Sequence, residues 1–201
     1  MTRLGPSASA PSFLRPWMIW TAGFLVFPLA GLAGTAVAGR VDDPLAALLG
    51  GVVAGLVLGI GQALASRQRL AARRWIPATA VGMGLGLLLG ASAVGYRTSL
   101  SDLAVMGALN GVVLGVAQAL ALPPRARARW AWAAALPALW ALAWTVTTLA
   151  GIAVDEQFTI FGVSGAVTFS ALSGLLLHQL LPDRAASSPR PAPHTPIKAT
   201  P

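Results

Sequence analysis

Hydrophobic positions along the chain fall into six long runs, separated by short polar connections. A helix of about 20 apolar residues crosses the roughly 30 Å hydrocarbon core of a bilayer. Each run is long enough for this and is bounded by arginine-rich or acidic connections. The predicted spans are residues 17–38, 45–66, 75–96, 103–122, 130–154 and 158–181. The pattern predicts an all-α, polytopic membrane protein with six transmembrane helices.

The second and fourth runs are near copies of each other. Each carries three glycines at a spacing of four, followed three residues later by a glutamine: Gly51, Gly55, Gly59 and Gln62, then Gly107, Gly111, Gly115 and Gln118. At 100° per residue these positions share one narrow helix face. The third run has a similar stripe at Gly82, Gly86 and Gly90.

These stripes are predicted to pack helices together. In lipid the hydrophobic effect does not drive helices together, so close contact across small residues supplies much of the association. Gln62 and Gln118 lie on the same stripes and can exchange hydrogen bonds between helices. We favour this structural role for the two glutamines, and binding of a substrate is the alternative.

A larger unit recurs three times. Arginine followed by tryptophan begins a run at Trp75 and Trp130, and Arg15-Pro precedes Trp17. Each such run leads through a polar turn to a span with small residues four apart. We therefore expect three tandem helical hairpins, at about 17–66, 75–122 and 130–181. Successive hairpins share one orientation, so the repeats would be parallel and related by a pseudo-threefold axis along the membrane normal.

Charge predicts the orientation. Of the 14 lysines and arginines, only Arg40 and Arg97 are expected on one side of the membrane. The other 12 lie in the two termini and in the connections between spans two and three and between spans four and five, which share the opposite side. The positive-inside rule then places both termini in the cytoplasm of a multi-pass protein of the inner (plasma) membrane. Anionic lipid is the expected partner of the cytoplasmic arginines. The net charge of +8 is explained this way, and nucleic-acid binding is not expected.

The two ends of the chain differ from the spans. Residues 1–16 contain proline and serine and are predicted to form a flexible lead, and the proline-rich residues 182–201 a disordered cytoplasmic tail. The first run, with its basic lead and Ala36-Val-Ala38, also resembles a signal peptide. Its apolar run exceeds the roughly 7–15 residues typical of such signals, so an uncleaved anchor is favoured over a cleaved one.

Few residues carry candidate chemistry. Cysteine is absent, and no Asp, Glu, Lys or Arg lies inside a run away from its ends. No catalytic motif is found, so we expect no enzyme, no cofactor and no metal. Asn110 is the deepest amide; a hydrogen bond to a neighbouring backbone is favoured over a polar path. His178 is interpreted as an interfacial polar residue, with a metal or pigment ligand as the alternative.

Tryptophans divide into two groups. Five fall near the arginine-bearing boundary and are predicted to anchor the helices at the membrane interface: Trp17, Trp20, Trp75, Trp130 and Trp132. Trp140 and Trp144 lie deeper, one helical turn apart. They are interpreted as a packed or lipid-facing stripe, with a cofactor platform as the alternative.

The repeated Gly-x3-Gly-x3-Gly-x2-Gln-x-Leu run, followed by arginines and a tryptophan-led span, resembles uncharacterised bacterial multi-pass membrane proteins built from the same unit. The resemblance covers residues 17–181 and implies the same fold, without an activity or a ligand. Two functions are consistent with the sequence. One is a packing scaffold or accessory subunit that associates with itself or with a larger membrane complex. The other is a passive channel or transporter for a small neutral or weakly polar solute.

Overall fold

The computed structural model describes residues 13–124, 126, 128–152, 154 and 162–181. Within these ranges the chain is all-α and contains no strand. The elements are α1 (Leu14–Ala22), the short 3-10 helix η1 (Gly23–Leu25), α2 (Val26–Ala38), α3 (Pro44–Ala65), α4 (Ala72–Ala93), α5 (Leu100–Ala121), α6 (Arg129–Leu149) and α7 (Val163–Leu180). Residues 1–12 of the predicted lead and the predicted tail, 182–201, lie outside the described residues.

Six helical segments are long and apolar enough to cross a membrane, which confirms the predicted class of fold. The first consists of α1, η1 and α2 together, and the other five are α3 to α7. At 1.5 Å per residue the 22 residues of α4 extend about 33 Å, which matches the hydrocarbon core of a bilayer.

Helix boundaries differ from the predicted spans where the ends are capped by local signals. Ser99 accepts a hydrogen bond from the backbone N–H of Asp102, so α5 begins at Leu100, before the predicted start at 103. At the end of α4, Gly95 and Tyr96 adopt left-handed conformations with φ of 60° and 59°. The Tyr96 N–H then donates to the Ala91 carbonyl at 2.9 Å, and the helix ends at Ala93 rather than 96.

The first span is interrupted by η1 between α1 and α2. Pro28 follows this interruption by one turn and has no N–H to donate to the Phe24 carbonyl. Its ring also crowds that carbonyl, so the regular α-helical geometry is lost in the turn before the proline.

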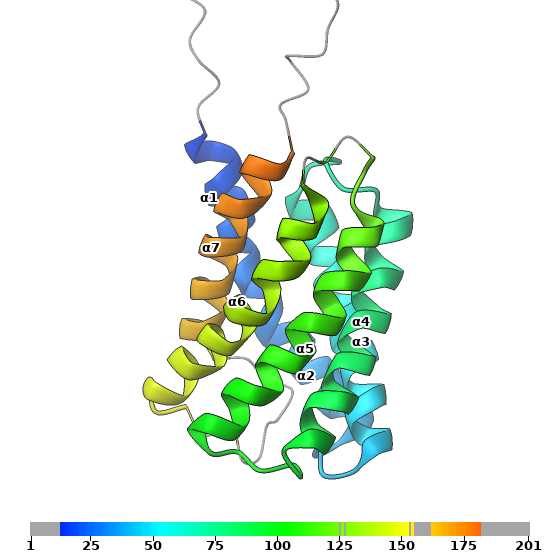
Figure 1. Ribbon diagram of the computed structural model, residues 1–201, viewed down its shortest axis with the longest axis vertical. Helices are drawn as coiled ribbons and strands as arrows, with labels where there is room; N and C mark the ends of the chain where they lie inside the picture. The colour runs from blue at the N-terminus through cyan, green and yellow to red at the C-terminus, as the bar shows by residue number, and fades with distance from the viewer. Residues whose placement is uncertain (1–12, 125, 127, 153, 155–161, 182–201) are drawn as a thin grey trace, which may run out of the picture.

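The helices form a closed ring in chain order. Each of α2 to α6 packs against the next helix along the chain, and α7 packs against α1. Figure 1 shows α1 beside α7 and α5 beside α6, with α3 and α4 behind. The interior of the ring holds the hydrophobic core.

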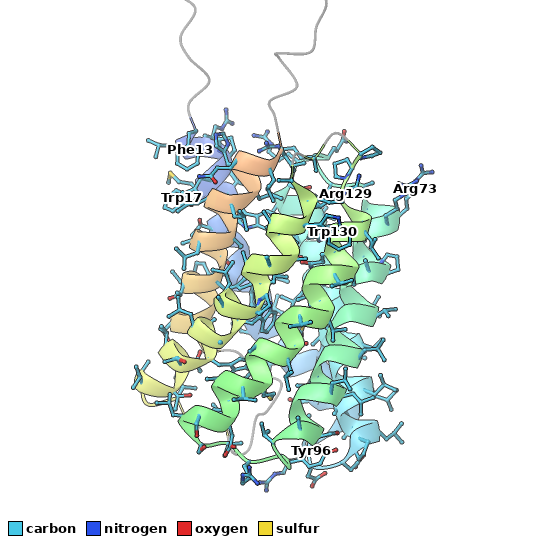
Figure 2. All side chains as sticks on the ribbon, viewed as in Figure 1. Phe13, Trp17, Arg73, Tyr96, Arg129 and Trp130 are labelled. Atoms are coloured by element: carbon cyan, nitrogen blue, oxygen red, sulfur yellow. The ribbon has the colours of Figure 1, made fainter. Side chains whose placement is uncertain are left out.

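The two ends of the bundle carry different side chains. Figure 2 shows Phe13, Trp17, Arg73, Arg129 and Trp130 at one end and Tyr96 at the other. We call the first of these the arginine end. The outer surface between the ends is apolar, with exposed Leu56, Ile60, Val81, Leu85 and Val112.

Candidate functional site

The predicted glycine stripes lie at contacts between helices. A Cβ atom added at any of the nine glycines would come within 3.0 Å of an atom of the next helix in the chain. At Gly55 the nearest atoms are the Ala80 Cα and the Thr79 carbonyl oxygen, both at 2.7 Å, and at Gly111 they are the Leu136 carbonyl oxygen and the Pro137 Cα, both at 2.6 Å. Because these neighbours are backbone atoms, they cannot rotate away.

Each glycine stripe contacts the helix that comes next in the chain. The glycines of α3 contact α4, those of α4 contact α5, and those of α5 contact α6. Further on, Gly165 of α7 lies against α6, and Gly174 lies against Trp17 and Trp20 of α1. The stripes of α3 and α4 therefore do not face each other, and each is filled by a different helix.

A polar network lies inside the ring near the arginine end, formed by Gln62, Trp75, Thr79, Gln118 and Trp132. The Gln118 amide nitrogen donates to Thr79 Oγ1 at 3.0 Å and to Gln62 Oε1 at 3.3 Å. Trp75 donates to Gln62 Oε1 at 2.9 Å, and Trp132 donates to Gln118 Oε1 at 3.0 Å. The network thus connects α3, α4, α5 and α6 through side chains, of which Trp75, Thr79, Gln118 and Trp132 are buried.

Burial changes the interpretation of the tryptophans. Trp75 and Trp132 are completely buried and meet edge to face, with ring centroids 6.0 Å apart. Their predicted role as interface anchors is therefore wrong. Each donates its N–H to a glutamine, Trp75 to the half-buried Gln62 and Trp132 to the buried Gln118. Trp130 is 57% exposed, as an interface anchor would be.

Asn110 is buried on α5 against Gly86 of α4. Its amide nitrogen contacts Met83 Sδ at 3.6 Å, and its Oδ1 has no hydrogen-bond partner among the described residues. The expected hydrogen bond to a neighbouring backbone is not formed, because the close approach at Gly86 directs the amide toward the sulfur. Asn110 lines neither the pocket nor the void described below.

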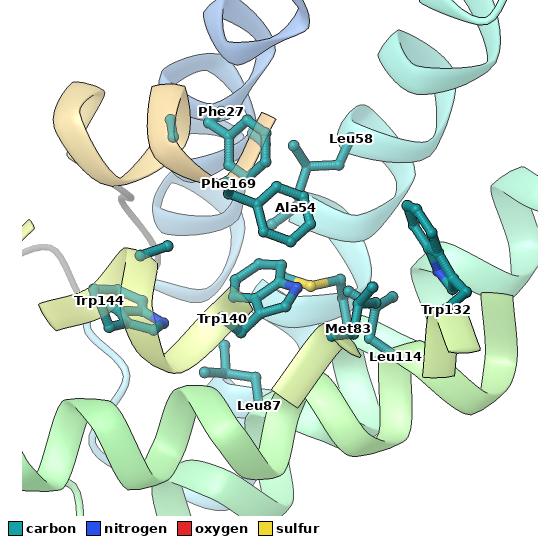
Figure 3. Packing of buried hydrophobic residues seen from close by; sticks show 14 of the residues in the cluster. Phe27, Ala54, Leu58, Met83, Leu87, Leu114, Trp132, Trp140, Trp144 and Phe169 are labelled. Atoms are coloured by element: carbon teal, nitrogen blue, oxygen red, sulfur yellow. The ribbon is translucent and has the colours of Figure 1, made fainter. Parts of the chain in front are cut away.

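Aromatic rings fill the middle of the bundle (Figure 3). Phe169 lies between Phe27 and Trp140, with ring centroids 5.7 Å and 5.3 Å away. Trp144 is also buried, so the two deep tryptophans pack into the core and do not face lipid. Leu58, Met83, Leu87 and Leu114 surround these rings.

A pocket of about 190 Å³ is hollowed into the arginine end, between α1, α7 and the connection that follows α3. It is lined by Pro16, Trp17, Trp20, Ala65, Ser66, Arg67, Arg69, Gly174, Leu177 and His178. A void of about 10 Å³ lies deeper, and Trp20 and Ala65 line both spaces. Gln62, Phe27 and Phe169 line the void, so the aromatic cluster lies directly beneath it.

The pocket presents nitrogen donors and no carboxylate, which suits an anion. His178 Nδ1 is buried without a hydrogen-bond partner among the described residues, and its ring contacts Phe13 at 4.6 Å between centroids. Arg67 has no ion-pair partner in the described part of the chain. Within that part, no three His, Cys, Asp or Glu side chains are grouped to hold a metal ion.

Sequence reasoning did not find this pocket. Its residues come from three segments that are far apart in the chain, and the arginines were used only to predict orientation and a general contact with anionic lipid. The available signals were Pro28, which interrupts the first span, and the placement of His178 near the same boundary as Arg67 and Arg69.

Comparison with known proteins adds no family to this description. No protein-family model matches the chain, and neither the curated proteins nor the solved structures include one that is similar to it.

Proposed function

We propose that this protein is a non-enzymatic membrane packing scaffold or accessory subunit of a membrane complex. The observation that carries the proposal is the filled centre of the ring. A channel for a polar solute needs a continuous path lined by polar groups. Here the rings of Phe27, Phe169 and Trp140 occupy the centre. Gln62 of the polar network reaches only the small void that Phe27 and Phe169 also line, so the network does not continue past these rings.

We propose that the ring consists of three tandem hairpins with pseudo-threefold symmetry, at about 17–66, 75–122 and 130–181. Hydrogen bonds where one hairpin meets the next support this arrangement. Trp75 donates to Gln62, Trp132 to Gln118, and Trp20 to Ser173 Oγ at 3.1 Å. The first two bonds each join a tryptophan early in one hairpin to a glutamine late in the preceding hairpin. The third joins a tryptophan early in the first hairpin to a serine late in the third, which closes the ring.

The contacts also support a register for the proposed repeat. Gly51, Gly55 and Gly59 lie against Met83, Ala80 and Ile76, whereas Gly107, Gly111 and Gly115 lie against Trp140, Pro137 and Ala133. The partners follow the same spacing in both cases. This register aligns Trp132, rather than Trp130, with Trp75.

We propose that the protein lies in the inner (plasma) membrane with its arginine end and both termini in the cytoplasm. Arg73 and Arg129 lie at the same end of the bundle as Trp17, which supports this orientation under the positive-inside rule. The proposed partners are the bilayer, with anionic lipid at the arginines, and a second copy or a larger membrane complex. Since the glycine stripes are filled within the chain, such a complex would contact the apolar outer surface.

A flux assay separates the scaffold from the passive channel. We expect proteoliposomes containing the purified chain to release glycerol or urea at the rate of protein-free liposomes, because the aromatic cluster closes the centre. Flux that rises with the amount of protein would establish the channel and refute the scaffold, and loss of that flux in Asn110→Leu would place the path along Asn110. The folded state of Asn110→Leu would be checked by size-exclusion chromatography.

A further inference from the structure

The pocket at the arginine end lies where α7 meets α1 and closes the ring. We propose that this pocket binds the phosphate group of an anionic phospholipid, whose acyl chains extend along the outer surface of α1. The ligand is additional to the packing role, and the proposal rests on the proposed orientation of the protein, with anionic lipid at the arginines.

The basic side of the pocket is held in a fixed shape. Ser66 Oγ donates to the Ala63 carbonyl at 2.7 Å and accepts from the Leu70 N–H at 3.3 Å, which closes the connection after α3. Arg69 donates to the carbonyl of Leu181 and so ties this connection to the end of α7. Arg67, with a left-handed φ of 49°, lies between these fixed points. Its guanidinium is the main candidate to contact the phosphate.

The opposite side of the pocket is apolar. Trp17 donates its N–H to the Ala171 carbonyl at 2.9 Å, and Trp20 donates to Ser173, so both indoles have already used their only donors. Together with Leu177 they offer ring and methyl surface to the pocket. A ligand that matches both sides carries an anion on an apolar body.

Size and position favour a phospholipid over a free phosphate ester. The pocket volume of about 190 Å³ is below the roughly 300–1,000 Å³ of pockets that enclose whole small molecules. It accommodates a glycerophosphate group and leaves the acyl chains outside. Leu14 and Met18 lie on α1, the helix that contributes Trp17 and Trp20 to the pocket; they are 60% and 61% exposed and can contact those chains. Basic pockets between helices near the cytoplasmic surface suit such headgroups.

The test is a titration of the purified full-length chain in a non-ionic detergent. The probes are dioctanoyl phosphatidylglycerol, dioctanoyl phosphatidylcholine and glycerol 3-phosphate, and binding is measured by calorimetry. We expect saturable binding of one phosphatidylglycerol per chain. Phosphatidylcholine, which has no net charge, and glycerol 3-phosphate, which has no chains, should each bind at least about tenfold more weakly.

Two variants and one control locate the binding. Arg67→Gln removes the main phosphate contact, and Ala65→Leu fills the pocket without a change of charge. Each should weaken phosphatidylglycerol binding about tenfold or more, the loss expected for one charge-assisted hydrogen bond or for an obstructed site. Arg73→Gln lowers the charge at the same end of the bundle but does not line the pocket, so its affinity should stay within about twofold of the parent. Size-exclusion chromatography checks that each variant is folded.

Three results would overturn the proposal. Equal weakening by Arg73→Gln and Arg67→Gln would show diffuse attraction to a basic surface. Binding of glycerol 3-phosphate as tight as that of phosphatidylglycerol would assign the pocket to a water-soluble phosphate ester. Undiminished binding by a folded Ala65→Leu protein would place the lipid elsewhere.

Discussion

Replacing both Gly55 and Gly111 with leucine should leave no folded protein. At each position the first added carbon would lie 2.6–2.7 Å from backbone atoms of the next helix, and the rest of the side chain has no space at all. The helices α3 and α4, and likewise α5 and α6, would have to separate. In a bilayer that separation removes the close packing that holds the helices together. We expect aggregated or degraded protein in place of a monodisperse peak.

The milder double variant, Gly55→Ala with Gly111→Ala, makes the effect measurable. Overpacking of this kind costs about 1–3 kcal/mol per site, which predicts a Tm lower by about 5 °C or more. Gly23→Ala is the control, because a Cβ there has an ordinary contact at 3.8 Å with Ala65 and the backbone φ is −59°. If the double alanine variant melts at the parent temperature in detergent, the glycine stripes are not the close contacts described here.

Replacing Gln118 with leucine should cause the second-largest loss of stability. Leucine has a similar volume but cannot bond to Thr79, Gln62 or Trp132. The variant therefore loses three hydrogen bonds and leaves the buried Trp132 N–H without an acceptor. Interhelical hydrogen bonds in membranes contribute about 0.6–2 kcal/mol each, so we expect a total loss of about 2–4 kcal/mol.

The control for Gln118→Leu is Gln179→Leu, which changes an exposed glutamine near the same end of the bundle and should leave the Tm unchanged. Trp132→Phe adds a second check. Once this tryptophan is gone, Gln118→Leu should cost less than it does alone, because the two side chains share a bond. Additive losses in the double variant would argue against the network.

The six membrane-spanning helices could be predicted because each needs only a long apolar run, which is a local property of the sequence. Helix ends were less predictable. The α4 terminus depends on left-handed Gly95 and Tyr96, and a tyrosine in that conformation has no sequence signature. The spacing of Gly82, Gly86 and Gly90 indicated a packing face but not its neighbour, because periodicity defines a face of one helix and carries no information about the next.

The roles of the tryptophans could not be separated by their position along the chain. Trp130 and Trp132 are two residues apart near the same boundary, yet they point to different sides of α6, and only the second meets a glutamine. The pocket was beyond prediction for a related reason. It exists because α7 returns to α1, and this contact between residues more than 150 positions apart has no local signal.

Cysteine accessibility tests most directly whether the chain crosses the membrane as successive hairpins. The sequence has no cysteine, so Asp43→Cys, Arg73→Cys and Arg129→Cys each introduce a single thiol near the start of a helix: just before α3, in the first turn of α4 and at the first residue of α6. In intact cells a membrane-impermeant maleimide should label the thiol at position 43 and should not label those at 73 and 129 until the membrane is opened. Labelling of positions 43 and 73 from the same side of the membrane would contradict the hairpin arrangement.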